Sequence, residues 1–564
     1  MQIHFRSLLL AAPIFLLAAC GKTNTQGKLI PKEAAFVFQI DGKSLSSKLS
    51  WDEIKQNTAF TEMSKDTSVP ATMKSILNNP DSAGIDTKTD LLLFALQDSA
   101  GGYVAVEGTI KNEDQFKIFV KTFADGGSEN EANGVKFISK APLCVGYTKE
   151  KFVYIFDAPQ MAGGMDALSK RMQQDSIDVT PVNKPRDVFN TCKSIFALTE
   201  SNSLAKNNKF SRLMKEPGDV HFWMNTEELT KKALSNPMLA MVNVDKLYKG
   251  SLTTAAINFE NGKININAKS YVGDDLAKLY KKYGDGKVNE DMLKRMPGKD
   301  IIGLMAIAYK PEGIRELLKL MNLDGIANMG LIKIGFTMDD FIKANKGDLV
   351  LGVSDLGMKS DSAHGEESYM PANPFSFNFI FAASIGDKDA FNKLINAGKK
   401  MGGEFFGDDR KAPFAYNSNG TYFAIANNKE TADKYLAGTN SNVDFINKIS
   451  GQAFAGYLNI HLLLKSFEKE ATKDSSASAA YNASLKLWDN ILIKGGDLKD
   501  DGVSQSIEVN LADKTTNSLK QLNQYAATLT EIYKAKKDKE KAMEAAFDSR
   551  LPAEDVVAPT TLIK

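Results

Sequence analysis

The chain is poor in the side chains that most often carry catalysis or bind metals. Its 564 residues include three cysteines and four histidines, and neither C-x-x-C nor H-E-x-x-H occurs. Metal centres need such ligands clustered at short spacing. We therefore predict no metal, no cofactor and no catalytic residue that a short motif would reveal.

Three weaker candidates for chemistry have the wrong spacing or composition. Residues 352–357 (GVSDLG) have one residue too many for the G-x-S-x-G elbow of hydrolases, and we interpret them as a turn at a strand end. Residues 21–23 (GKT) lack the earlier glycine of a phosphate-binding loop. His364 and the three carboxylates within residues 361–367 could bind a divalent cation, although a solvated polar loop is the commoner arrangement.

No excess of one charge marks a surface for nucleic acid. The 70 Lys and Arg residues are matched by 69 Asp and Glu residues. Residues 1–19 contain Arg6 and no acid, so without them the balance is 69 to 69. Nucleic-acid binding is therefore not predicted, and there is no polybasic patch to support binding to anionic membranes.

Long apolar runs are also absent, with one exception at the start of the chain. Arg6 precedes the apolar residues 7–17, and small residues then lead into Cys20 in the sequence Leu17-Ala18-Ala19-Cys20. This layout is typical of a secretory signal peptide and is too short for a spanning helix. We predict a signal peptide over residues 1–19. An ordinary signal peptide with a chance cysteine is the alternative.

The residues around Cys20 resemble the bacterial lipoprotein signal. The resemblance implies cleavage before Cys20, a diacylglycerol thioether on its sulfur, and a fatty acid such as palmitate on its new amino group. Several acyl chains are needed because a single chain binds membranes only marginally. Gly21 stands where an aspartate would favour the inner membrane, so the resemblance points to an outer-membrane lipoprotein. No acidic run follows Cys20, which favours the periplasmic face.

Residues 20–28 are polar and lack apolar periodicity, so we interpret them as a lipid-anchored tether before a body that begins at Leu29. Cys144 and Cys192 remain in what should be an oxidising compartment. They could form a disulfide. Cys144 lies in an apolar, strand-like run, however, and two buried free thiols are an equal alternative.

Two stretches of the chain repeat the same order of predicted elements, which indicates an internal duplication. The matching segments are 30–56 with 296–321, 90–93 with 348–351, 103–110 with 377–385, 140–142 with 411–413 (both KAP), and 152–156 with 422–426. Each stretch then carries a shorter variant of its own opening, in which Asn225 aligns with Asn459. Hairpins with type I′ turns at 261–262 and 501–502 follow, and helices at 275–283 and 516–533 close the two halves.

We therefore predict an α+β protein of two tandem duplicated halves, each an antiparallel sheet with helices packed on one face. The first half covers residues 29–289, the second covers 290–547, and an extended tail follows at 548–564. Alternation in residues 263–267 (KININ) indicates that one sheet face is wet. The Ser- and Ala-rich residues 473–480 are expected to form a mobile loop.

The aromatic residues of the predicted strands, Phe36, Phe38, Phe222 and Trp223, are most simply core. With the lipoprotein signal, the opening at residues 30–35 (IPKEAA) and the duplicated body resemble an uncharacterised bacterial lipoprotein family, domain of unknown function 4836. The resemblance implies an envelope lipoprotein and brings no catalytic residues.

Three functions stay open. The preferred one is a lipid-anchored envelope protein that acts as a binding or scaffold protein and not as an enzyme, and whose partner is an unknown protein, glycan or lipid. The first alternative is a hydrolase with paired carboxylates, which leave no short motif. The second is a carrier of an apolar ligand between the two halves, which predicts a sizeable apolar cavity.

Overall fold

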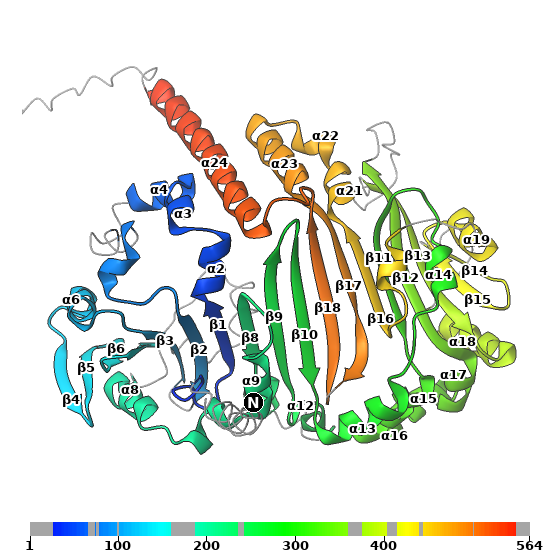
Figure 1. Ribbon diagram of the computed structural model, residues 1–564. Helices are drawn as coiled ribbons and strands as arrows, with labels where there is room; N and C mark the ends of the chain where they lie inside the picture. The colour runs from blue at the N-terminus through cyan, green and yellow to red at the C-terminus, as the bar shows by residue number, and fades with distance from the viewer. Residues whose placement is uncertain are drawn as a thin grey trace, which may run out of the picture.

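The computed structural model describes residues 26–548, except for 66–73, 75–77, 99–100, 159–185, 235–241, 359–374, 403–413, 439–443 and 500. Figure 1 shows one broad, twisted antiparallel sheet of 18 strands with helices along both ends of the strands. The protein is therefore α+β, as the alternation of predicted strands and helices indicates.

Ten strands come from the first half: β1 (Phe36–Asp41), β2 (Asp90–Asp98), β3 (Gly101–Thr109), β4 (Ser128–Ala132), β5 (Val135–Lys140), β6 (Leu143–Tyr147), β7 (Lys151–Asp157), β8 (Val220–Met224), β9 (Leu252–Glu260) and β10 (Lys263–Tyr271). The second half supplies β11 (Ile301–Ala308), β12 (Asn345–Met358), β13 (Phe375–Ile385), β14 (Ala415–Ser418), β15 (Tyr422–Ala426), β16 (Phe454–Asn459), β17 (Trp488–Lys499) and β18 (Gly502–Leu511).

The helices of the first half are α2 (Gly42–Lys48), α3 (Trp51–Lys55), α4 (Thr58–Lys65), α6 (Glu113–Phe123), α8 (Val188–Phe196), α9 (Asn208–Leu213), α10 (Thr226–Leu234), α12 (Asp245–Tyr248) and α13 (Asp274–Tyr283). The second half has α14 (Glu290–Lys294), α15 (Pro311–Leu320), α16 (Asp324–Lys333), α17 (Met338–Ala344), α18 (Lys388–Gly402), α19 (Lys429–Ala437), α20 (Ile446–Ile449), α21 (Ile460–Lys465), α22 (Glu468–Ala471), α23 (Ser475–Leu487) and α24 (Ser518–Asp548).

The strand order is the same on either side of the central β10–β18 pair. Outward from β10 it runs β9, β8, β1, β2, β3, β7 and β6, and outward from β18 it runs β17, β16, β11, β12, β13, β15 and β14. β5 and β4 extend the first side. This order is what two fused copies of one unit would produce, while the duplication itself stays a prediction.

Aligned residues of the two halves also share a local role. Asn225 follows β8 and accepts a hydrogen bond from the backbone N–H of Glu228 at 3.2 Å, which caps α10. Asn459 ends β16 and accepts from the N–H of Leu462 at 2.9 Å, which caps α21. An asparagine oxygen at this position satisfies a helix N–H that lacks an intrahelical partner.

Helices pack on both faces of the sheet, not on one as the sequence suggested, although one face stays open over the central strands. In the first half, α8 and α9 pack on one face through Cys192 and Phe210, in a core that includes Trp223. α6 packs on the opposite face, where Phe116 contacts Phe152. The period-2 pattern identifies which side chains share a face but not which helix covers them.

Local structure differs from the sequence predictions at four places. Residues 352–357, interpreted as a turn, lie within β12, where the register shifts between Ser354 and Gly357. The sequence also predicts one helix over residues 44–56, but it breaks at Ser50, whose hydroxyl and Glu53 form a capping box that starts α3. The turn at 261–262 is not type I′, because only Gly262 has a positive φ, of 67°. The loop expected at 473–480 is instead largely helix α23, since Asp474 caps an alanine-rich segment.

Candidate functional site

One face of the sheet carries an apolar row that crosses the central strands. Hydrogen-bonded neighbours place Ile40, Val220, Ile257, Ile266, Ile507, Ile493, Met305 and Leu351 in register, with Gly456 between the last isoleucine and Met305. None of the eight side chains is buried, and Met305 is 41% exposed. A sheet face of this composition normally lies in a closed core, so this face is available to something apolar.

The aromatic residues expected in the core separate onto the two faces. Trp223 is buried against Phe210, with ring centroids 5.6 Å apart. Phe36, Phe38 and Phe222 lie on the apolar face, where Phe222 contacts both others and Phe38 is 36% exposed. The core prediction is therefore wrong for Phe38 and only partly right for Phe36 and Phe222.

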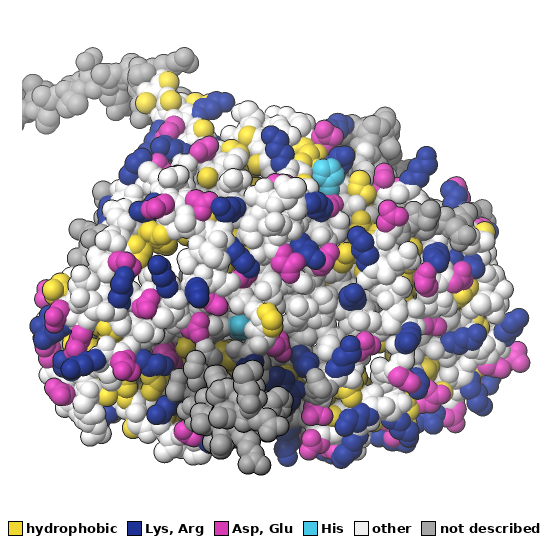
Figure 2. All heavy atoms as spheres, in the orientation of Figure 1, with side chains coloured by type: hydrophobic (Ala, Val, Ile, Leu, Met, Phe, Trp, Pro, Cys, Tyr) yellow, Lys and Arg dark blue, Asp and Glu magenta, His cyan; other side chains and the backbone are white. Residues whose placement is uncertain are grey.

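The opposite face is polar over the same strands. Lys263, Asn265 and Asn267 of β10 are in register with Asn510, Glu508 and Ser506 of β18. The Lys263 ammonium lies 2.9 Å from the Glu508 carboxylate. Figure 2 shows this face. Over its centre most side chains are charged or otherwise polar, and few are hydrophobic. The alternation in KININ thus correctly indicates one wet face.

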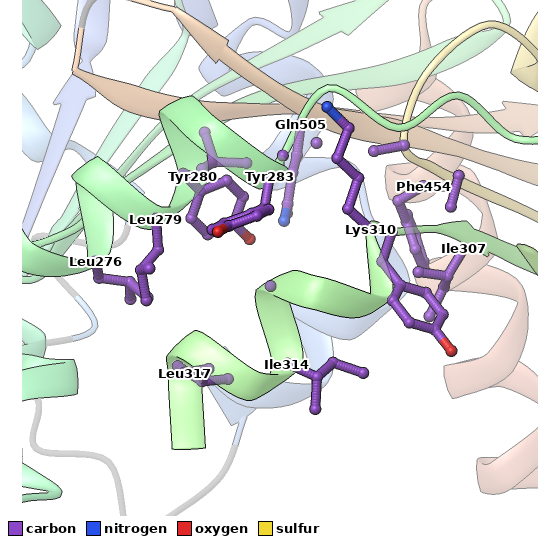
Figure 3. A pocket seen from close by; sticks show the side chains of 17 residues that line it. Leu276, Leu279, Tyr280, Tyr283, Ile307, Lys310, Ile314, Leu317, Phe454 and Gln505 are labelled. Carbon is purple, nitrogen blue, oxygen red and sulfur yellow. The ribbon is translucent and has the colours of Figure 1, made fainter. Parts of the chain in front are cut away.

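At one end of the strands, the apolar face continues into a cavity of about 430 Å³. Its walls come from α13, α15 and the strand ends beneath them; the lining side chains include Leu276, Leu279, Tyr280, Tyr283, Ile307, Ile314, Leu317, Phe454, Val503 and Gln505. Figure 3 shows the leucines and tyrosines of α13 on one side and Ile314 and Leu317 of α15 on another. The cavity therefore lies where the last helix of the first half meets the first long helix of the second.

The sequence explains why these two helices present apolar side chains to each other. Leu276, Leu279, Tyr280 and Tyr283 follow the i, i+3, i+4, i+7 spacing of one helix face. Pro311 begins α15 at the position where proline's missing N–H has no cost. The two helices touch where Gly313 of α15 lies against Tyr283 of α13, and beside this contact their apolar faces line a cavity of ligand size.

Charge at the cavity is confined to its edge. Lys310 is the charged residue of the lining, and its ammonium lies 2.6 Å from Asp285. This ion pair lowers the pKa of Asp285 below its usual range. Burial raises the pKa of Tyr309, and Asp348 adds to the effect. The interior therefore suits hydrocarbon, while one cationic side chain lies beside it.

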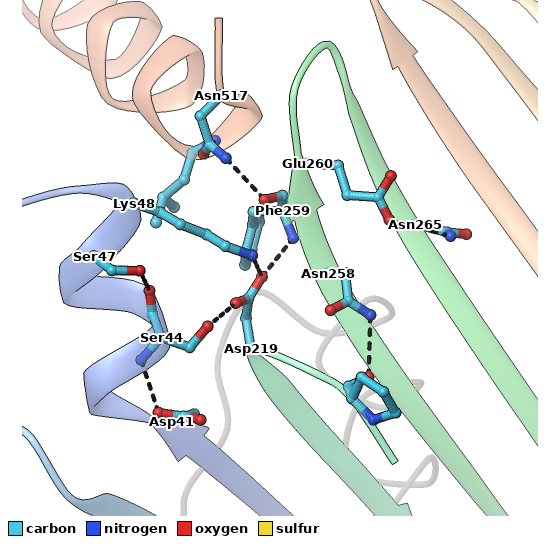
Figure 4. A network of polar contacts seen from close by, with 12 residues as sticks. Asp41, Ser44, Ser47, Lys48, Asp219, Asn258, Phe259, Glu260, Asn265 and Asn517 are labelled. Atoms are coloured by element: carbon cyan, nitrogen blue, oxygen red, sulfur yellow. Dashed lines mark hydrogen bonds and ion pairs between the residues drawn. The ribbon is translucent and has the colours of Figure 1, made fainter.

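The hydrolase alternative requires two carboxyl groups facing a common cleft. Asp219 is buried and its carboxylate binds the Ser44 hydroxyl, the Lys48 ammonium and the Phe259 backbone N–H, each at 2.6 Å (Figure 4). This network joins α2 to the ends of β8 and β9 and already occupies both carboxylate oxygens. We interpret Asp219 as structural.

A pair of carboxylates surrounds Arg186. Two guanidinium nitrogens bind the two oxygens of Asp98 at 2.7 Å each, and a third nitrogen lies 3.2 Å from Asp157. The guanidinium therefore holds both acids in ion pairs. Within the described residues, no group of three or more His, Cys, Asp and Glu side chains is arranged to hold a metal ion.

The residues singled out from the sequence are not brought together into one site. Cys20 and the loop with His364 lie outside the described residues. His221 is buried, and its ring nitrogens contact Gln39 and the carbonyl of Glu216. Cys144 and Cys192 are buried in the same core as free thiols, which is the second of the two alternatives left open.

Comparison with family models tests the prediction of the family to which the chain belongs. The model of a domain of unknown function, DUF4836, matches residues 27–404. The chain belongs to the DUF4836 family. The resemblance noted in the sequence is thereby confirmed at the level of the family, whose description states no function.

Other comparisons add little. No curated protein matches the sequence significantly. Crystal form IV of TP0453 is similar at 11% identity, with a TM-score of 0.24, over 44% of this chain and 83% of that one. Crystal form III matches at 10% identity and a TM-score of 0.23, over 46% and 88%. Likenesses at these scores do not establish a shared fold, and we infer nothing from them.

A search of the described residues for membrane-crossing helices has a negative result. None of their helices combines the length and apolar character that a bilayer span requires.

Proposed function

We propose that this DUF4836 protein is a lipid-anchored protein of the cell envelope that binds an apolar ligand in the cavity between α13 and α15. This proposal combines two of the three functions that the sequence left open, the lipid-anchored binding protein and the carrier of an apolar ligand. The observation that carries it is the cavity itself, which has the size and lining of a ligand site.

The anchor is supported by the sequence before residue 26. Residues 7–17 are apolar, small residues precede Cys20, and Gly21 follows it. Acyl chains on Cys20 would hold the protein on the outer membrane, at its periplasmic face, with the residues before Gln26 as tether, because Gln26 and Gly27 already contact Asp90 and Phe210. Because the mature chain has no net charge, attachment would depend on the acyl chains and not on anionic lipids.

The cavity favours a ligand with a hydrocarbon chain and a small polar end. Each methylene transferred from water contributes about 0.8 kcal/mol, so eight buried methylenes would contribute about 6 kcal/mol before the cost of association. Lys310 at the edge favours an acidic head group. Its ion pair with Asp285 is exposed and can be exchanged for another at little cost.

The proposal is tested by titrating delipidated protein with cis-parinaric acid, a fluorescent fatty acid. Ile314→Trp fills the cavity from α15, and because Ile314 is half-buried the larger side chain can be accommodated without disrupting a closed core. We expect the variant to weaken binding at least tenfold.

The matched control is Ile118→Trp, an equal change on α6 at a side chain that is 67% exposed. This variant should bind as the wild type does. Thermal unfolding of all three proteins checks that the fold is retained. Equal affinities for wild type and Ile314→Trp, or no saturable binding to wild type, would refute the proposal.

A further inference from the structure

Helix α16 exposes large apolar side chains that the fold does not use. Ile326, Met329 and Ile332 are 60%, 62% and 65% exposed, the largest such group on any one described helix. They recur every three residues along the ten residues of the helix. A single exposed isoleucine is ordinary, but three on one face of one helix call for a partner.

The other side of α16 already has its own contacts. Leu323, Ala327 and Leu331 are partly buried where α16 packs beside α15 and α17. The helix is thus apolar on two sides, and its polar residues are limited to Asp324, Asn328 and Lys333. A helix that is hydrophobic all round belongs in a core or in a membrane.

The shape and size of this surface favour a fluid partner over a protein. Gly325 and Gly330 face open space, so the three side chains project from a convex ridge and not from a pocket. Together they offer on the order of 300 Å², whereas a stable protein interface needs about 800 Å² from each side. A bilayer needs no complementary pocket and accepts apolar side chains of this kind at its interface.

Residues 30–32 lie at the same end of the strands as α16, whereas the side chain of Gln26, where the described chain starts, hydrogen-bonds Asp90 at the start of β2. The N–H of Leu204 donates to the carbonyl of Ile30 at 2.9 Å, which places residues 30–32 beside α9. The ammonium of Lys209 in α9 lies 4.6 Å from the centre of the Tyr271 ring, at the end of β10 that leads into α13. In Figure 1, α9, α13, α15 and α16 all lie along the lower edge.

The length of the chain between Cys20 and residue 26 limits the distance from residue 26 to acyl chains on Cys20. Residues 20–26, fully extended, span at most about 25 Å. Acyl chains on Cys20 would therefore hold residue 26 within about that distance of the membrane, and α16 and the cavity could meet the same bilayer when the molecule tilts about this point.

We propose that α16 is a bilayer-contact helix whose Ile326, Met329 and Ile332 enter the interface of the membrane that carries the anchor. The cavity between α13 and α15 then faces the same membrane, from which an acyl chain could enter without crossing water. The orientation rests on the proposed lipid anchor. The contact of α16 with lipid does not require the cavity to bind a ligand.

The test places an environment-sensitive NBD probe on Met329→Cys in the full, membrane-extracted protein. Cys144 and Cys192 are buried and should not react while the protein is folded. The protein is reconstituted into phosphatidylethanolamine–phosphatidylglycerol vesicles containing a lipid with a nitroxide quencher in its acyl chain. We expect a blue-shifted emission and at least twofold quenching. Adding Ile326→Ser and Ile332→Ser should remove most of both effects.

The matched control carries the same probe on Ile118→Cys, which is equally exposed but lies on α6. Its emission should stay that of a probe in water. Equal emission and quenching at the two positions would overturn the inference. So would a blue shift at Met329→Cys that depends on protein concentration without vesicles, because it would indicate a second copy as the partner.

The mass of the N-terminal peptide, measured on the same sample, reports whether Cys20 is acylated. If Cys20 is unmodified it would itself take up the probe, so the labelling is repeated with Cys20→Ser; an unmodified Cys20 together with quenching at position 329 in that variant would refute the anchor and retain the bilayer contact. An acylated Cys20 without quenching would refute the contact and retain the anchor. Ligand binding by the cavity is measured separately, in the absence of vesicles.

Discussion

Substituting Asp219 tests which contacts stabilise the sheet at the end opposite the cavity. Its buried carboxylate accepts three hydrogen bonds, from Ser44, Lys48 and the backbone of Phe259 (Figure 4). The carbonyl of Phe259 in turn accepts from the Asn517 side chain at 2.9 Å, just before α24. Asp219→Ala would therefore loosen α2, two strand ends and the start of the last helix together.

The expected cost follows from the partners that lose their acceptor. A hydrogen bond to a charged group contributes about 1.5–3 kcal/mol, and a buried donor left without an acceptor costs about 1–3 kcal/mol. The Lys48 side chain is 25% exposed and can regain water, so its share is small. Because the three bonds share one carboxylate, their effects do not add fully. We expect Asp219→Ala to lower the free energy of unfolding by about 3–4 kcal/mol.

Urea unfolding, followed by both circular dichroism and tryptophan fluorescence, measures this change and shows whether the transition has one step. Asp52→Ala is the matched control: its carboxylate is 81% exposed, its ion pair with Lys55 lies within one helix turn, and we expect an effect below about 0.5 kcal/mol. If the two variants unfold at the same urea concentration, the structural role assigned to Asp219 is wrong.

Two further predictions concern the second half. The guanidinium of Arg295 lowers the pKa of Asp291, so this acid stabilises the fold fully above its unfolded pKa of about 3.9 and loses that effect as the pH falls through its lower folded pKa. Asp291→Asn should therefore lower the melting temperature at pH 6, and the difference from the wild type should shrink as the pH is lowered below about 3.9. A difference that stays constant over this whole titration would contradict the argument. Gly347 has a φ of 89°, and a Cβ there would lie 1.7 Å from the Tyr309 carbonyl oxygen. Gly347→Ala should therefore lower the free energy of unfolding, measured in urea, by at least about 2 kcal/mol. The control Gly325→Ala, where a Cβ would meet nothing within 4 Å, should not lower it.

Local sequence patterns predicted much of the fold. Apolar runs of strand length and paired turn signals located the main strands, and the order shared by the two halves agrees with the observed strand order. The helix at the end of the body continues through residues 535–547 as a solvated extension, as the dense charges of that segment indicate. These strands, turns and helices are determined by residues close together in the sequence, so a sequence pattern can predict them.

The features that matter most for function depend on distant pairings. β10 and β18 are 239 residues apart at equivalent positions such as Asn267 and Ser506, and no periodicity identifies them as partners. Phe38 has the apolar character of a core residue, yet the face it occupies is not closed by a helix. The cavity exists because α13 and α15, which come from different halves, meet over the strand ends and line it together.

One signal for α16 was present in the sequence. Residues 324–333 (DGIANMGLIK) have apolar side chains on more than one side of a predicted helix, which is unusual for a surface segment. Periodicity alone would have assigned such a helix to the core. Only its position at the edge of the sheet shows that its outer side faces away from the protein.

The central claim is that the cavity between α13 and α15 binds an apolar ligand, and photoaffinity labelling tests it most directly. Delipidated protein is irradiated with a diazirine-bearing fatty acid, digested, and analysed by mass spectrometry, with unlabelled fatty acid as competitor. The account predicts competable labels concentrated in residues 274–283 and 311–320. Labels spread over the exposed apolar side chains, with none competed from these two helices, would contradict it.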